Sequence, residues 1–123
     1  MIKNYIIFSV IFLVIDAFYL NLSANYFNNQ VKIIQGENLQ LNMISTVLCY
    51  LFLTTGIFYF AIIKNLSITE CFFLGLFVYG VFETTSHAIF KKWKYKTILM
   101  DTVWGGVLFA SSVYAYKNLV NYI

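Results

Sequence analysis

The sequence predicts an all-α membrane protein, a single domain over residues 1–123 with four transmembrane helices in an up-down-up-down bundle. Hydrophobic residues make up 61% of the chain, against about 45–50% in soluble domains, and charged residues only 11%, against about 25%. The apolar residues gather in four stretches of about 20 residues, the length of helix that crosses a bilayer. The last connections are short, which favours antiparallel neighbouring helices.

Each expected helix follows from one of these apolar stretches. The four ranges are about 4–24, 43–63, 68–90 and 96–116. After the first stretch comes the only sizeable polar segment, in which we expect the helix to continue to Gln35, end at Gly36 and restart near Asn42. Residues 64–67 form the second connection and the basic turn 91–94 the third. Because the chain contains no proline, the helices should be largely continuous.

The charged and sulfur-containing residues exclude several classes of function. All eight basic residues are lysines, and arginine is absent, so the net charge of +3 does not indicate a nucleic-acid partner. Cys49 and Cys71 are too few for a disulfide framework and lack the spacing of a metal site. We therefore expect no metal, no cofactor and no nucleic acid, with the lipid bilayer as the main partner.

The distribution of lysines predicts the orientation of the helices in the membrane. One side would carry Lys3, Lys64 and Lys117, and the other side would carry Lys32, Lys91, Lys92, Lys94 and Lys96. Since cytoplasmic loops carry an excess of lysine and arginine, we expect the first and third loops in the cytoplasm. Trp93 and Tyr95 beside the third-loop lysines are typical of an interfacial anchor.

Ionisable residues inside the spans are the candidate functional residues. A charge in mid-membrane costs a few kcal/mol, so such groups usually face the bundle interior or a water-filled cavity. Asp16, Glu83, His87 and Asp101 all lie roughly 5 to 12 Å below the same face, counted at helical rise. Glu83 and His87 share one helix face as an i, i+4 pair. Trp104, three residues after Asp101, is placed either to donate its indole N–H to that carboxylate or to pack.

Four motifs resemble those of a known family. They are Asp16-x-x-Tyr19-Leu20, Tyr79-x-x-Phe82-Glu83-Thr84-Thr85-Ser86, Trp93, and Asp101-x-x-Trp104-Gly105. They are similar, in the same order, to the Asp-x-x-Trp-Leu, Tyr-Asp-Leu-Thr-Asn, Trp-Pro and Asp-x-x-Trp-Gly motifs of an uncharacterised family of small four-helix membrane proteins found mostly in bacteria. Several positions depart from that pattern, among them Tyr19 for Trp, Glu83 for Asp, Ser86 for Asn and Lys94 for Pro. The resemblance implies no activity, but it groups Asp16, Glu83, Thr85, Asp101 and Trp104 into one constellation.

Three kinds of function remain open from the sequence. The leading interpretation is a carboxylate-lined pocket that binds or passes a proton or small cation, in a protein that forms homo-oligomers. A structural or assembly subunit, whose buried carboxyls only specify helix packing, is the main alternative. A lipid-modifying enzyme is favoured less, because no nucleophile motif or metal signature supports it.

Overall fold

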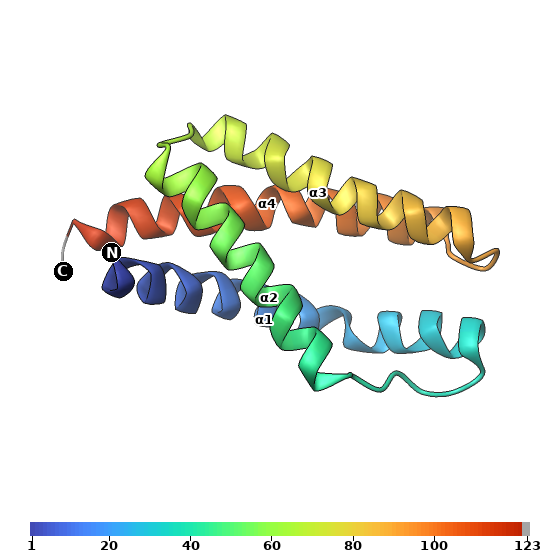
Figure 1. The fold of residues 1–123 in the computed structure, drawn as a ribbon. Helices are drawn as coiled ribbons and strands as arrows, with labels where there is room; N and C mark the ends of the chain where they lie inside the picture. Colours follow the sequence, from blue (N-terminus) through green and yellow to red (C-terminus); the bar gives the residue numbers. More distant parts are fainter. Residues whose placement is uncertain (122–123) are drawn as a thin grey trace.

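The computed structural model describes residues 1–121, and these residues form helices and loops without a strand (Figure 1). The helices are α1 (Ile2–Gln35), α2 (Met43–Ile57) with its π-helical continuation η1 (Phe58–Ile63), α3 (Ile68–Ile89) and α4 (Tyr95–Val120). By length and composition, α1, α2 together with η1, α3 and α4 could each cross a membrane. The all-α class with four candidate spans is therefore confirmed, whereas the up-down-up-down course stays a prediction.

The helices pack on one another to very different extents. α3 and α4 form the most extensive pair, and α4 also packs along α1. α2 lies obliquely to the other helices and has only light contact with α1, while the start of α1 and the end of α4 lie at the same end of the ribbon (Figure 1). Since α2 is held by few contacts, individual side-chain hydrogen bonds matter more for its position than for that of α4.

Local sequence signals determine where helices begin and end. Gly36 adopts φ 79°, the left-handed conformation that glycine takes without a Cβ penalty, and its N–H reaches the carbonyl of Lys32 at 2.8 Å, so α1 ends there. The Asn42 side chain accepts a backbone N–H in the first turn of α2. Ser67 and Glu70 form a reciprocal capping box that starts α3.

The C-terminal third of α1 lies beyond the length needed to cross a membrane. With 34 residues at 1.5 Å per residue, α1 is about 51 Å long, against a hydrocarbon core of about 30 Å. The polar residues of the 25–35 region continue the same helix. α1 therefore carries polar side chains alongside the α3–α4 connection, outside the apolar span.

α2 and η1 form one uninterrupted helix, Met43–Ile63, but its hydrogen bonding changes near the end. From Phe58 onward the backbone hydrogen bonds span five residues, as between the Lys64 N–H and the Tyr59 carbonyl at 3.3 Å. The wider turn occurs where Phe58 and Ala61 are both buried in the core. No proline or glycine is needed for such a turn, so the sequence pattern did not signal it.

A solid aromatic core fills the half of the molecule that contains the chain ends. Phe8 and Phe12 of α1 are fully buried and meet Tyr116 and Phe109 of α4, with ring centroids 6.0 and 6.1 Å apart in edge-to-face arrangements. Phe58 of η1 packs its ring against Phe8. Asp16 lies at the border of this core, one turn after Phe12 on α1, and its partner Tyr50 packs its ring on Phe12.

The outer surface is apolar on every helix. Phe18, Phe52, Phe77 and Leu99 expose 67%, 79%, 64% and 69% of their surface, respectively. A soluble monomer rarely exposes large contiguous apolar patches, whereas hydrocarbon chains solvate such side chains well. The exposed side chains therefore form the surface that faces lipid.

The polar extension of α1 is fastened to the start of α4 by buried hydrogen bonds. Gln30, only 1% exposed, donates from Nε2 to the Lys92 carbonyl at 2.8 Å and accepts from the Thr97 hydroxyl at 2.9 Å. Thr97 in turn shares a hydrogen bond of 2.6 Å with the Tyr26 hydroxyl. This group couples the position of the α3–α4 connection to that of α1.

The buried hydrogen bonds of Gln30 should contribute to the stability of the folded protein. Replacing Gln30 with Leu leaves the Lys92 carbonyl without its donor, and an unsatisfied buried polar group costs about 1–3 kcal/mol. We expect the Gln30→Leu variant to unfold at a lower fraction of SDS in mixed micelles. The matched control is Gln40→Leu, an exposed position in the α1–α2 loop. Equal midpoints for both variants would contradict the proposed fastening.

Candidate functional site

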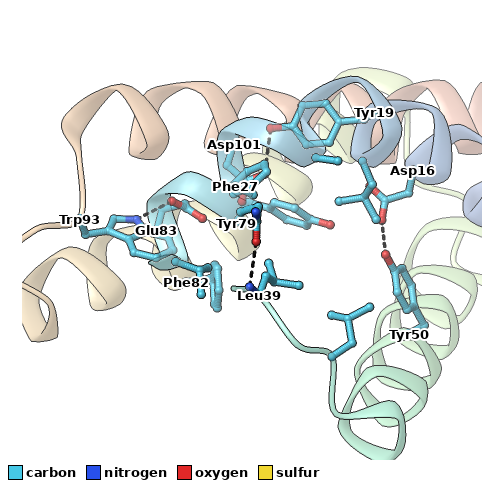
Figure 2. A pocket seen from close by; sticks show the side chains of 15 residues that line it. Asp16, Tyr19, Phe27, Leu39, Tyr50, Tyr79, Phe82, Glu83, Trp93 and Asp101 are labelled. Atoms are coloured by element: carbon cyan, nitrogen blue, oxygen red, sulfur yellow. Dashed lines mark hydrogen bonds between the residues drawn. The ribbon is translucent and has the colours of Figure 1, made fainter. Parts of the chain in front are cut away.

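A cavity of about 620 Å³ lies in the half of the molecule opposite the aromatic core (Figure 2). All four helices, the α1–α2 loop and the α3–α4 connection contribute to its wall, which consists mainly of apolar and aromatic side chains with three carboxylates among them. The lining residues are Asp16, Tyr19, Leu20, Ala24, Phe27, Asn28, Val31, Leu39, Leu41, Tyr50, Tyr79, Phe82, Glu83, Trp93 and Asp101. Lysine and histidine are absent from this lining, so no cationic side chain of the wall neutralises the carboxylates.

Asp16 connects three helices. It is 4% exposed on α1, and its Oδ1 accepts the indole N–H of Trp104 of α4 at 3.0 Å. Its Oδ2 accepts the hydroxyl of Tyr50 of α2, as Figure 2 shows. Both carboxylate oxygens therefore have a donor, and this residue fixes the oblique α2 against α1 and α4.

Asp101 of α4 accepts a hydrogen bond from the tyrosine of the Asp16 motif on α1. Tyr19, three residues after Asp16 on α1, donates its hydroxyl to Asp101 Oδ1 at 3.2 Å. Its ring stacks on that of Trp104, with centroids 4.4 Å apart. The Asp-x-x-Tyr motif of α1 and the Asp-x-x-Trp motif of α4 thus pair reciprocally, each aromatic residue donating to the other helix's carboxylate. Trp104 serves Asp16 rather than its own-helix neighbour Asp101, because its indole projects across the α1–α4 interface.

Glu83 is the most completely buried of the carboxylates, with no exposed surface. Its Oε1 accepts the indole N–H of Trp93 at 2.9 Å, so Trp93 contacts a buried carboxylate instead of acting only as the expected interfacial anchor. No donor among residues 1–121 reaches its Oε2. Glu83 and Asp101 line the same cavity and are called the carboxyl pair below.

Two residues proposed from the sequence lie elsewhere. Thr85 is exposed on α3 and does not line the cavity. His87, one turn after Glu83, also lies outside the lining, and its ring packs on that of Tyr95 with centroids 4.5 Å apart. The structure therefore brings together Asp16, Glu83, Asp101 and Trp104, and it separates Thr85 and His87 from them.

The α1–α2 loop contributes two leucines to the cavity wall. Leu39 and Leu41 line it, and the Leu39 backbone N–H donates to the Asn28 side chain of α1 at 2.8 Å (Figure 2). The sequence marked this segment only as polar, and its alternating Leu residues were the signal that it packs. Tyr50 and Tyr79, the second of which begins the motif of the third span, are also part of the wall.

The geometry of the carboxylates bears on which ligands they could hold. Within residues 1–121, no group of three His, Cys, Asp or Glu side chains is close enough together to hold a metal ion. Asp16 already has both oxygens hydrogen-bonded, so the unsatisfied carboxylate oxygen of this site is Glu83 Oε2.

Four apolar spans and an apolar outer surface define an integral, multi-pass helical membrane protein. Over residues 1–117 the chain matches the family described as "Predicted membrane protein (DUF2177)", and it belongs to that family. The resemblance to an uncharacterised family of small membrane proteins is thereby confirmed. No curated protein and no solved structure matches the chain.

Proposed function

We propose that this protein binds a proton or small monovalent cation at Glu83 and Asp101 inside the membrane and exchanges it with one aqueous side. The observation that carries the proposal is the fully buried Glu83, whose Oε2 receives no hydrogen bond within residues 1–121 and which lines the same cavity as Asp101. A positive charge held between the two carboxyls would compensate both.

The energetics of buried carboxyls support this proposal. Two carboxylates at close range in a low-dielectric site cannot both ionise cheaply, as the paired carboxyls of aspartic proteases illustrate. The lining of the cavity provides no lysine to offset the charge. A shared proton satisfies both groups, and a bound cation can replace that proton. The same two residues can therefore exchange one for the other.

The position of the cavity supports access from one side. Leu39 and Trp93, which belong to the first and third loops, line it, whereas the aromatic core fills the half near the chain ends. The lysine distribution favours a cytoplasmic position for both loops, so we propose cytoplasmic access to the site. Complete passage across the bilayer would then require a conformational change or an interface between subunits of a homo-oligomer.

Ion flux into proteoliposomes tests the proposed function. Purified wild-type protein should carry protons or a monovalent cation at a rate that saturates with concentration. We expect the Glu83→Gln and Asp101→Asn substitutions to reduce that flux at least about tenfold, because an amide cannot exchange a proton at neutral pH. Glu37→Gln, which alters an exposed loop carboxylate, is the matched control and should retain full flux.

The structural alternative rests on Asp16, whose oxygens are both engaged by other helices. If the carboxyls served only to specify helix packing, Glu83→Gln and Asp101→Asn would lower stability in detergent, and wild type would show no flux above empty liposomes. That result would overturn the proposed function and leave an assembly subunit.

A further inference from the structure

The cavity beside the carboxyl pair is far larger than a simple ion requires. We infer that the cation bound at Glu83 and Asp101 is the head group of an organic ammonium ion, whose apolar body occupies the cavity. The inference rests on the proposed function and names the class of ligand. A volume of about 620 Å³ lies within the range of about 300–1,000 Å³ typical of sites for small organic molecules.

The wall of the cavity is suited to a cation with an apolar body. Tyr19, Phe27, Tyr79, Phe82 and Trp93 all contribute to it. Aromatic ring faces attract quaternary ammonium groups within about 6 Å, and this attraction strengthens when water is excluded. Leucine and valine side chains complete the wall and offer dispersion contacts to the rest of the ligand.

The polar groups of the wall discriminate against other ligands. The Tyr19 hydroxyl and the Trp93 indole N–H are already donated to Asp101 and Glu83, so these donors are engaged before a ligand enters. An anion would meet three carboxylates without a compensating lysine in the lining. A neutral apolar molecule carries no charge to replace the proton that the two carboxyls share. A monocation compensates their charge and gains the aromatic contacts.

Charge balance predicts a measurable consequence. With one proton held by the carboxyl pair, binding of a monocation leaves both carboxyls ionised around it and releases that proton to water. A quaternary ammonium ion has no proton of its own to release. The expected stoichiometry is therefore up to one proton released for each quaternary ion bound, at a pH where the empty pair is protonated.

Calorimetric titration of the purified wild type in detergent micelles, corrected for empty micelles, tests the inference. The probe is benzyltrimethylammonium, compared with its uncharged isostere neopentylbenzene, with tetramethylammonium, and with Na⁺. We expect the probe to bind at least about tenfold more tightly than each of the three, with proton release followed by a pH-sensitive dye. Glu83→Gln should abolish binding. Phe82→Leu, which removes one ring of the wall, should weaken binding of both quaternary ammonium ions. Phe77→Leu, at an exposed position outside this lining, should leave binding unchanged.

The outcomes separate this inference from the proposed function. Equal affinity for the probe, tetramethylammonium and Na⁺, with proton release, would overturn the inference and leave the carboxyl site standing. Equal affinity for the probe and neopentylbenzene without proton release would show a site for neutral apolar ligands and overturn it as well. Flux of protons or Na⁺ without binding of the probe would refute the organic ammonium ligand and leave the proposed function standing. Absence of both binding and flux refutes both proposals.

Discussion

A Gly75→Ala variant is expected to lose the tight packing of α3 on α4. A Cβ atom at Gly75 would lie 2.1 Å from the Gly105 carbonyl oxygen and 2.7 Å from the Phe109 ring. The first of these neighbours is backbone, so the two helices would have to move apart. Overpacking usually costs about 1–3 kcal/mol and occasionally more. Because this helix pair is the most extensive in the protein, we expect a loss of at least about 3 kcal/mol.

The control for Gly75→Ala is Gly56→Ala in α2, because an added Cβ at Gly56 meets nothing within 4 Å. Alanine is favoured over glycine within a helix by up to about 1 kcal/mol, so this control should be neutral or stabilising. The fraction of SDS at the unfolding midpoint, followed by helical circular dichroism, measures both variants. A Gly75→Ala midpoint equal to that of Gly56→Ala would refute the close approach of α3 and α4.

An Asp16→Ala variant is expected to release α2 from the rest of the molecule. The change leaves the Trp104 indole and the Tyr50 hydroxyl without their acceptor. Interhelical hydrogen bonds in membranes contribute roughly 0.6 to 2 kcal/mol each, so the loss should be about 2–3 kcal/mol. Since α2 has only light contact with α1, the effect should appear as an early step in unfolding, monitored by SDS titration and by protease cleavage in the α1–α2 loop.

Asp16→Asn separates hydrogen bonding from charge. Its amide oxygen can accept from Trp104, and its amide nitrogen can donate to the Tyr50 hydroxyl, which acts equally well as an acceptor. We expect this variant to keep most of the wild-type stability, within about 1 kcal/mol. A loss as large as that of Asp16→Ala would mean that the negative charge itself, and not the hydrogen bonds, stabilises the arrangement.

Composition and spacing predicted the class of fold, because hydrophobicity and helix length follow directly from the bilayer. They also selected Asp16, Glu83 and Asp101, since a carboxyl within an apolar span needs partners. Counting residues from the ends of the helices put these three at one depth, and the structure places all of them on one cavity wall.

The hydrogen-bond donors of these carboxyls could not be predicted from the spacing within one helix, because the donors lie on other segments of the chain. Trp104 was considered with Asp101, its neighbour in sequence, but the antiparallel register of α1 and α4 pairs it with Asp16. Trp93 resembled an interfacial anchor because lysines surround it, and only the course of the α3–α4 connection turns its indole toward Glu83. His87 was expected to share a helix face with Glu83 near the carboxyls, but its ring packs on that of Tyr95 and it does not line the cavity.

The hydrogen bonds of the two indoles have a spectroscopic consequence. The chain contains two tryptophans, and Trp93 and Trp104 donate to carboxylates of the same site, one to Glu83 and one to Asp16. Indole emission responds to nearby charge and polarity, so all of the tryptophan fluorescence of this protein originates beside its carboxylates. Trp93→Phe and Trp104→Phe would each leave a single tryptophan, so that, with excitation selective for tryptophan, an event at Asp16 and an event at Glu83 could be recorded separately without attaching any dye.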